Sequence, residues 1–90
     1  MCNKLFYPAI FHKAEEGGFW ISFPDFPECL TQGDSLINAI DMGIDAASGW
    51  ILGELEAGND FPMASKPEDV EYDEGSFINL LVFDINAYYT

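Results

Sequence analysis

The side chains that could do chemistry in this 90-residue chain are mostly carboxylates. Asp and Glu total 16, against three Lys, no Arg, one His and two Cys. A cluster of about four carboxylates can hold two divalent metals roughly 4 Å apart and hydrolyse a phosphodiester. Acids are too abundant here for their number to indicate such a cluster. Asp84, in an apolar run, and Asp25, between two prolines, are the individual candidates.

Histidine and cysteine give a second possible chemistry. His12 with Cys2, Cys29 or Asp25 could ligate a metal, but no two of them show ligand spacing such as C-x-x-C. A nucleophilic Cys29 would need a positive environment, and Glu28 beside it has the opposite charge. We therefore predict a protein that is not an enzyme, with no catalytic residues, no metal and no cofactor. His12 is interpreted as a strand-end histidine, and both thiols as small buried side chains.

The formal net charge of −13 restricts the class of partner. Nucleic-acid and anionic-membrane binding depend on Lys and Arg, so we predict neither for these residues. The acids form either a solvated surface or one that attracts a basic partner, and charge alone does not choose between them. No apolar run reaches about 18 residues and no secretory signal precedes residue 5, so we expect a cytoplasmic protein.

The elements that must position these side chains are four strands and one long helix. The turn at residues 15–18 makes the first two strands a hairpin. Ser35 is expected as a helix N-cap, because its side-chain oxygen can accept a hydrogen bond from an N–H of the first turn. Gly58 is expected to end the helix, because glycine adopts the left-handed conformation at little cost. Pro8 is awkward in a strand, since it lacks the N–H that a ladder needs. The expected elements are strands 5–12, 19–23 and 29–31, a helix 36–57 and a strand 76–86.

One face of the expected helix is apolar, and the other is acidic. The apolar positions recur at spacings of three and four, and several are small enough to let the helix lie close to a sheet. Trp50 is assigned to the core. The inward positions are Leu36, Ile40, Gly43, Ala47, Trp50 and Ile51, and the outward acids are Asp41, Asp45, Glu54 and Glu56.

The connection through the helix predicts the direction of the last strand. A right-handed crossover places that strand parallel within the sheet, which makes the sheet mixed. Apolar residues occupy both faces of strand 76–86, whereas a half-exposed strand would alternate with polar residues. We therefore predict that a second copy or another partner covers the second face, giving a dimer or higher oligomer. The alternative is that a short turn after Pro67, capped by Ser65, covers it.

Two short segments and one long one carry a family resemblance. YPA at residues 7–9, GG at 17–18 and the run FPDFPECLTQGDS at 23–35, followed by an Ala-studded helix, resemble the HicB-like antitoxin family. The resemblance covers essentially all 90 residues and implies one HicB-like antitoxin domain, 1–90. Many family members continue into a DNA-binding domain, and we expect no C-terminal DNA-binding domain here.

The resemblance also implies a fold and a partner. The expected fold is α+β, a partial RNase H-like β-β-β-α-β arrangement: one mixed four-stranded sheet with one main helix on one face. The expected partner is a HicA-like toxin, a small basic mRNA-cleaving protein whose active surface the antitoxin covers. The strand at 5–12, which would carry a central acid in an RNase H-like nuclease, contains none. An orphan binding module and a metal-dependent nuclease remain the alternatives.

The proline-rich loop and the turn after it provide the expected contact residues. Prolines stiffen the loop, so little ordering entropy is lost on binding, and its acids would face Lys or Arg of the toxin. Each position also has a structural alternative: Phe26 plugs the core end, and the 33–35 turn caps the helix. The predicted partner-binding residues are Asp25, Phe26, Glu28, Gln32 and Asp34.

Overall fold

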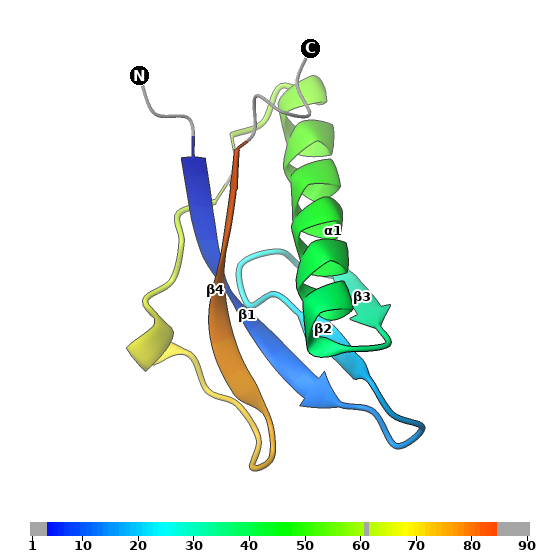
Figure 1. The fold of residues 1–90 in the computed structure, drawn as a ribbon. Helices are drawn as coiled ribbons and strands as arrows, with labels where there is room; N and C mark the ends of the chain where they lie inside the picture. Colours follow the sequence, from blue (N-terminus) through cyan, green and yellow to red (C-terminus); the bar gives the residue numbers. More distant parts are fainter. Residues whose placement is uncertain (1–3, 61, 85–90) are drawn as a thin grey trace.

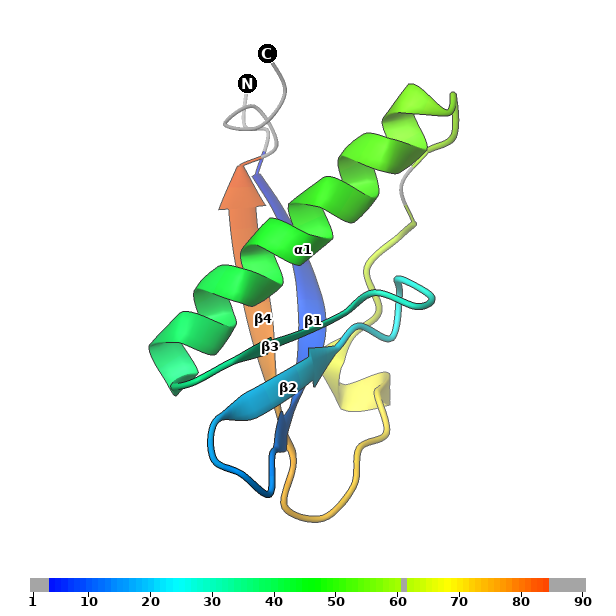
Figure 2. The ribbon, with the colours of Figure 1, turned by 90° about the vertical axis from the view of Figure 1, so that its right-hand side faces the viewer.

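The computed structural model describes residues 4–60 and 62–84. A four-stranded sheet, ordered β3-β2-β1-β4, carries one long helix across one face (Figures 1 and 2). The α+β class with one main helix is therefore confirmed. The elements are β1 Lys4–Lys13, β2 Phe19–Ser22, β3 Leu30–Gly33, α1 Leu36–Glu56, the 3-10 turn η1 Pro67–Asp69 and β4 Phe77–Asp84.

The prediction of a mixed sheet with a parallel last strand is wrong. β4 pairs with β1 in antiparallel register, from Lys4 opposite Asp84 to Phe11 opposite Phe77, and the other two strand pairs are also antiparallel. The reason is the length of the connection. After α1, residues 62–76 run back along the sheet (Figure 1). β4 therefore starts at the end of the sheet where a direct crossover would have placed its last residue.

The ends of α1 follow the local sequence. The Ser35 side chain accepts a hydrogen bond from the Asn38 backbone N–H at 3.1 Å, and Gly58, just beyond the helix, has a φ of 84°. A positive φ suits glycine because it has no Cβ, and the helix ends at Glu56, one residue before the predicted end. The first-turn Leu36 is exposed rather than inward. The fully or nearly fully buried helix residues are Ala39, Gly43, Ala47, Ser48 and Ile51.

The core lies between α1 and one face of the sheet. Gly43 is one place where the two layers approach tightly: a Cβ there would lie 2.8 Å from Cδ1 of Leu81 and 3.3 Å from Cδ1 of Ile21. The absence of a side chain at Gly43 therefore lets the helix settle onto β2 and β4. The buried apolar residues are Tyr7, Ala9, Phe11, Ile21, Phe23, Phe26, Cys29, Ala39, Ala47, Ile51 and Leu81.

Pro8 lies in the middle of β1, although a proline cannot donate to a strand ladder and is usually confined to edge strands and bulges. The register with β4 runs unbroken past it, so no bulge accommodates it. On the other side, the pairing of β1 with β2 begins only at Ile10, because β2 has just four residues. At Pro8, β1 is therefore locally an edge strand, and only one side of it takes part in the ladder.

The second face of the sheet is partly covered by the chain itself. Residues 62–76, including η1, lie on the side of β1 and β4 opposite α1 (Figures 1 and 2). Pro8, on this face, is fully buried, whereas five large apolar side chains remain exposed. These are Phe6, Trp20, Leu30, Leu80 and Val82. The turn after Pro67 thus lies on the predicted side and leaves much of this face open.

Candidate functional site

The proline-rich loop between β2 and β3 is two consecutive tight turns. The Phe26 N–H donates to the Phe23 carbonyl and the Cys29 N–H to the Phe26 carbonyl, each at 3.2 Å. Pro24 and Pro27 each occupy the second position of a turn, where a fixed φ near −65° is preferred. Two prolines and two backbone bonds therefore hold this loop in one shape before any partner arrives.

Asp25 anchors the loop to the segment that follows α1. Its carboxylate accepts the backbone N–H of Ser65 at 3.0 Å and the Ser65 hydroxyl at 2.5 Å. The predicted role of Ser65 as a cap for η1 is wrong, since η1 has no side-chain cap bond and the hydroxyl is used here. Asp25 is half-buried, and both of its oxygens serve the fold.

Phe26 lies in the core rather than on the loop surface. It is 1% exposed, with its ring centroid 4.5 Å from that of Tyr7 and 4.7 Å from that of Trp50. The Tyr7 hydroxyl donates to the Pro62 carbonyl at 2.5 Å. Burial, and secondarily the charge of Asp25, raises the pKa of Tyr7. The ring of Phe26 therefore closes the end of the core, which was the alternative to its predicted role as a contact residue. It offers no surface to a partner.

Glu28 is an exposed acid held in an unfavourable backbone conformation. Its φ is 65°, the one positive value among the described non-glycine residues. Pro27 before it and the Phe26–Cys29 hydrogen bond give the pattern of a type II turn, which favours glycine at this position. A left-handed non-glycine residue is disfavoured by about 1–2 kcal/mol. A carboxylate kept at such a position suggests a use outside the fold.

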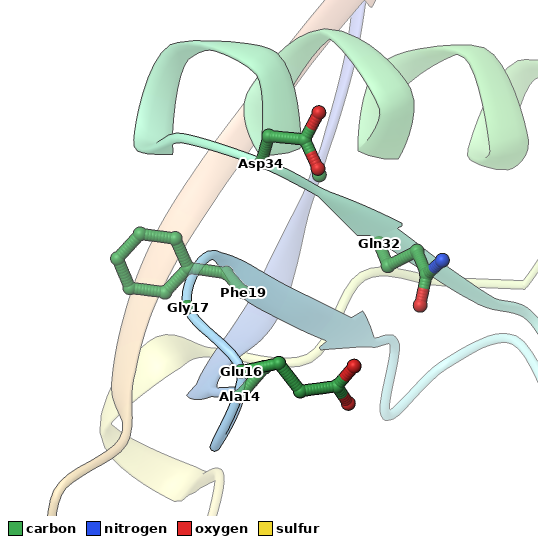
Figure 3. A pocket seen from close by; sticks show the side chains of 7 residues that line it. Ala14, Glu16, Gly17, Phe19, Gln32 and Asp34 are labelled. Atoms are coloured by element: carbon green, nitrogen blue, oxygen red, sulfur yellow. The ribbon is translucent and has the colours of Figure 1, made fainter.

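Gln32 and Asp34 lie together with Glu16, around a hollow at the far end of β3 from Glu28. The cavity is about 200 Å³ and lies between the β1–β2 turn and the end of β3 (Figure 3). Phe19 pairs with Gly33 in the sheet, which brings the hairpin turn to this place. The lining residues are Ala14, Glu16, Gly17, Phe19, Gln32, Gly33 and Asp34.

Sequence reasoning missed Glu16. It was assigned only to a turn, because its proximity to Asp34 depends on the register of β2 against β3. The signal that could have found it is the glycine pair after it. A Cβ on Gly18 would collide with the carbonyl oxygen of Gly33 and lie 3.1 Å from Cα of Asp34. The glycine thus lets the turn pack against the end of β3.

We call Glu16, Glu28, Gln32 and Asp34 the β3 edge surface. β3 is an outer strand of the sheet and pairs only with β2 among the described residues. Glu28 precedes β3 and Asp34 follows it, a separation of about 20 Å at 3.3 Å per residue. All four side chains are exposed. This surface offers three carboxylates and one amide, which can accept hydrogen bonds from Lys, Arg or backbone N–H groups.

The residues considered for metal or nucleophile chemistry lie apart. His12 Nε2 lies 2.9 Å from Oγ of Ser22, and Nδ1 lies 3.2 Å from Oγ of Ser76. Cys29 is buried, and burial raises its thiol pKa, which lowers the thiolate fraction. Within residues 4–60 and 62–84, no group of three or more His, Cys, Asp or Glu has the geometry to hold a metal ion. Cys2 and the side chain of Asp84 lie outside the part of the chain that the structure describes.

His12 instead belongs to a stacked pair on the face opposite α1. Its ring lies 3.6 Å from the Trp20 ring, centroid to centroid, at an interplanar angle of 10°. Desolvation lowers the pKa of His12, and the nearby Asp73 opposes that shift. A neutral imidazole donates one hydrogen bond and accepts another, which suits two hydroxyl partners.

The described part of the chain also contains no helix with the length and hydropathy for a membrane span.

Comparison with known proteins gives a family match over nearly the whole chain. The family model described as the HicB-like antitoxin of bacterial toxin–antitoxin systems matches residues 7–86. A curated relative, Antitoxin HicB 1 of Photorhabdus laumondii, is 52% identical over 44 residues. That match covers 49% of this chain and only 28% of the relative's length.

Solved structures share the fold at low sequence identity. One is a toxin–antitoxin complex from Streptococcus pneumoniae, with a TM-score of 0.83 and 23% identity, covering 94% of this chain and 72% of that one. Another is the HicA3 and HicB3 toxin–antitoxin complex, with a TM-score of 0.69 and 23% identity, covering 84% and 94%. These similarities establish the arrangement of the sheet and helix.

Proposed function

Because this chain belongs to the HicB-like antitoxin family, we propose that it binds and neutralises a small basic toxin of the HicA type. The observation that carries the proposal is the family match over residues 7–86, joined to a net charge of −13. Two neighbours of the same fold come from toxin–antitoxin complexes. The mechanism we propose is masking: the antitoxin covers the surface on which the toxin would receive its RNA.

The β3 edge surface is our proposed toxin contact. Its carboxylates lie on a preorganised loop and on the rim of a hollow of about 200 Å³, into which a Lys or Arg side chain can reach. Opposite charges attract over a Debye length of about 8 Å at physiological ionic strength, so the acidic chain accelerates encounter before contact forms. Glu28, Gln32 and Asp34 would make the direct contacts. Asp25 and Phe26 would act by holding the loop in its shape.

Neutralisation in this proposal needs no catalysis by the antitoxin. The Cys29 thiol is buried with a raised pKa, and the ring nitrogens of His12 are both placed against serine hydroxyls. With three Lys and no Arg, the chain also has little with which to bind phosphates, so we expect no direct nucleic-acid contact from it. We expect the pair to act in the cytoplasm, where mRNA is available.

The test is rescue of bacterial growth from a small basic toxin of the HicA type. Induction of the toxin alone should arrest growth, and co-expression of residues 1–90 should restore it. The purified pair should elute as one complex and lose RNase activity. An unrelated protein of equal size and acidity is the control, since it tests whether charge alone binds a basic toxin. Persistent arrest with both proteins present at equal levels would count against the proposal.

A further inference from the structure

Trp20 is a large aromatic side chain that stays exposed on the face of the sheet opposite α1. It is 41% exposed, and Leu30 on β3 is 64% exposed. Trp20 lies opposite Gln32 in the strand register, and Leu30 comes two residues before Gln32. Trp20 and Leu30 are therefore diagonal neighbours on one face of the sheet. A hollow of about 350 Å³, which we call the Trp20 hollow, is lined by Trp20, Leu30, Thr31 and Gln32.

The indole of Trp20 is held in place by its neighbours. His12, opposite it on β1, stacks against the ring with the centroids 3.6 Å apart and the planes at 10°. The ring nitrogens of His12 lie 2.9 Å from Oγ of Ser22 and 3.2 Å from Oγ of Ser76, so the stack has fixed partners. A ligand that docks on this indole therefore orders little that is not already ordered. Rigid, exposed tryptophans are frequent anchors of protein interfaces.

The stack with His12 leaves the other face of the indole to a ligand. His12 lies on the β1 side of Trp20, whereas the Trp20 hollow lies on the β3 side, with Leu30 and Gln32. An aromatic face attracts cations, and the planar guanidinium of arginine also stacks on it. Leu30 can contact the methylene stem of an arginine, and the amide oxygen of Gln32 can accept from its N–H groups. The Trp20 hollow therefore fits an arginine side chain.

The Trp20 hollow adjoins the β3 edge surface. Gln32 lines both this hollow and the one between Glu16 and Asp34 that Figure 3 shows. A partner whose cations reach those carboxylates also reaches the indole without leaving the surface. The apolar contact and the acidic contact thus belong to one continuous site.

Acids also lie on the other side of Trp20. Asp73 and Glu74 line a hollow of about 300 Å³ together with Trp20 and His12, and one base, Lys13, lines it too. Carboxylates therefore flank the indole on both its β1 and its β3 side. Such surroundings attract a basic partner and repel an acidic one, including a second copy of this −13 chain.

We propose that Trp20 is the anchor of the toxin contact and takes an arginine side chain of the toxin on its open face. This inference rests on the proposed function, and it adds an apolar centre to a contact made of charges. The carboxylates of the β3 edge surface attract and orient the toxin. The indole, once the arginine excludes water from it, supplies a large share of the affinity.

The experiment is isothermal titration calorimetry of residues 1–90 with a purified toxin of the HicA type. Trp20→Ala should raise the dissociation constant at least about 30-fold, the loss expected of an interface anchor. Trp20→Phe keeps an aromatic face and should raise it less than about tenfold, whereas Trp20→Leu should bind as weakly as Trp20→Ala. The matched control is Ile37→Ala/Met42→Ala, which removes exposed apolar side chains from α1, in the other layer, and should leave affinity unchanged.

A second measurement uses the wild-type chain, so it holds even if Trp20→Ala unfolds. The chain has two tryptophans, and Trp50 is stacked on Phe26 in the core. In the nuclear magnetic resonance spectrum of the isotope-labelled chain, each indole N–H gives its own signal. Addition of unlabelled toxin should shift the signal of Trp20 strongly and that of Trp50 less.

Loss of the anchor and loss of the proposed function give different results. A wild-type chain that does not bind the toxin would overturn both. Equal affinity of the wild type and Trp20→Ala, or a Trp20 signal that stays in place, would overturn the anchor and leave the function intact. Equal affinity of Trp20→Phe and Trp20→Leu would overturn the arginine contact. A Trp20 signal that shifts with the concentration of this chain before toxin is added would assign the hollow to a second copy instead.

Discussion

Asp25 and Ser65 lock two loops together that are 40 residues apart in the chain. The serine donates both its backbone N–H and its hydroxyl to the aspartate carboxylate, at 3.0 and 2.5 Å. One loop bears Glu28, and the other carries the chain from the α1 side of the sheet to the opposite side. These two hydrogen bonds therefore couple the shape of the proposed toxin contact to the path of the segment that connects α1 to β4.

Removal of the carboxylate should cost more stability than removal of the hydroxyl. Asp25→Ala leaves two Ser65 donors without their acceptor and should lower the free energy of unfolding by about 1–3 kcal/mol. Ser65→Ala keeps the backbone bond and should lower it by about 0.5–1.5 kcal/mol. Urea denaturation measures both. The double variant should lose less than the sum of the two, and strict additivity would mean that the two residues are not coupled.

Substitution of Glu28 should change stability and binding in opposite directions. Glu28→Gly relieves a φ of 65° and should raise the free energy of unfolding by up to about 1 kcal/mol. The same change removes a proposed contact, so toxin affinity should fall. Glu28→Gln, which keeps a side chain on the strained backbone, is the control and should lower affinity with little change in stability. Unchanged affinity in both variants would remove Glu28 from the contact.

Charge on the β3 edge surface should matter more than charge elsewhere. The triple variant Glu16→Gln/Glu28→Gln/Asp34→Asn should slow association with the toxin by about tenfold at low salt, because steering and contact are both lost. Asp41→Asn/Asp45→Asn/Glu56→Gln removes the same charge from exposed positions on α1 and is the matched control. Stopped-flow association kinetics measure both. Equal slowing by the two triples would mean that only net charge matters.

Gly33 and Gly49 should respond to alanine with opposite signs. A Cβ at Gly33 would lie 2.5 Å from Cα of Ala39 and 2.9 Å from the carbonyl carbon of Asn38, backbone atoms that cannot rotate away. Gly33→Ala should therefore destabilise by about 1–3 kcal/mol. Gly49, on the exposed side of α1, has nothing within 4 Å, so Gly49→Ala should stabilise by about 0.5–1 kcal/mol. Thermal melts of both variants provide the measurement.

His12 should make the fold more stable at neutral than at mildly acidic pH. Burial lowers its pKa in the folded state, against the smaller opposing effect of Asp73. The unfolded chain then takes up its proton at higher pH than the folded one, with a pKa of about 6.5. The contribution of His12 to the free energy of unfolding is complete above the pKa of the unfolded chain, and it is lost as pH falls through the pKa of the folded state. His12→Gln should flatten the change in urea midpoint between pH 7.5 and 5.5, and an unchanged slope would assign it to other groups.

The sequence predicted those parts of the fold that depend on nearby residues. Ser35 and Gly58 delimit α1 through contacts within a few residues, so both helix ends were predicted to within one residue. The direction of β4 was predicted wrongly because it depends on the path of residues 57–76. That path is fixed by contacts such as Tyr7 with Pro62 and Asp25 with Ser65, which join segments 55 and 40 residues apart and leave no periodic pattern.

The candidate site, too, was predictable only where it depends on residues that are near one another in the sequence. Gln32 and Asp34 were predicted as contact residues because they belong to one unusual run, and the structure places both on one hollow. Glu16 joins them only through strand register, which composition does not encode. Asp25 and Phe26 belong to the same run but point into the fold, and a proline-rich loop does not reveal which of its side chains face inward. Contact of any of these residues with a toxin stays a prediction.

The pairing of β1 with β4 also has a consequence for how the molecule is made. Residues 4–13 leave the ribosome before their neighbours at 77–84, which are translated some 70 codons later. β1, β2, β3 and α1 can assemble while translation continues, but the nascent sheet keeps one side of its central strand open throughout. The nascent sheet therefore remains vulnerable to proteases and to mispairing until β4 is released.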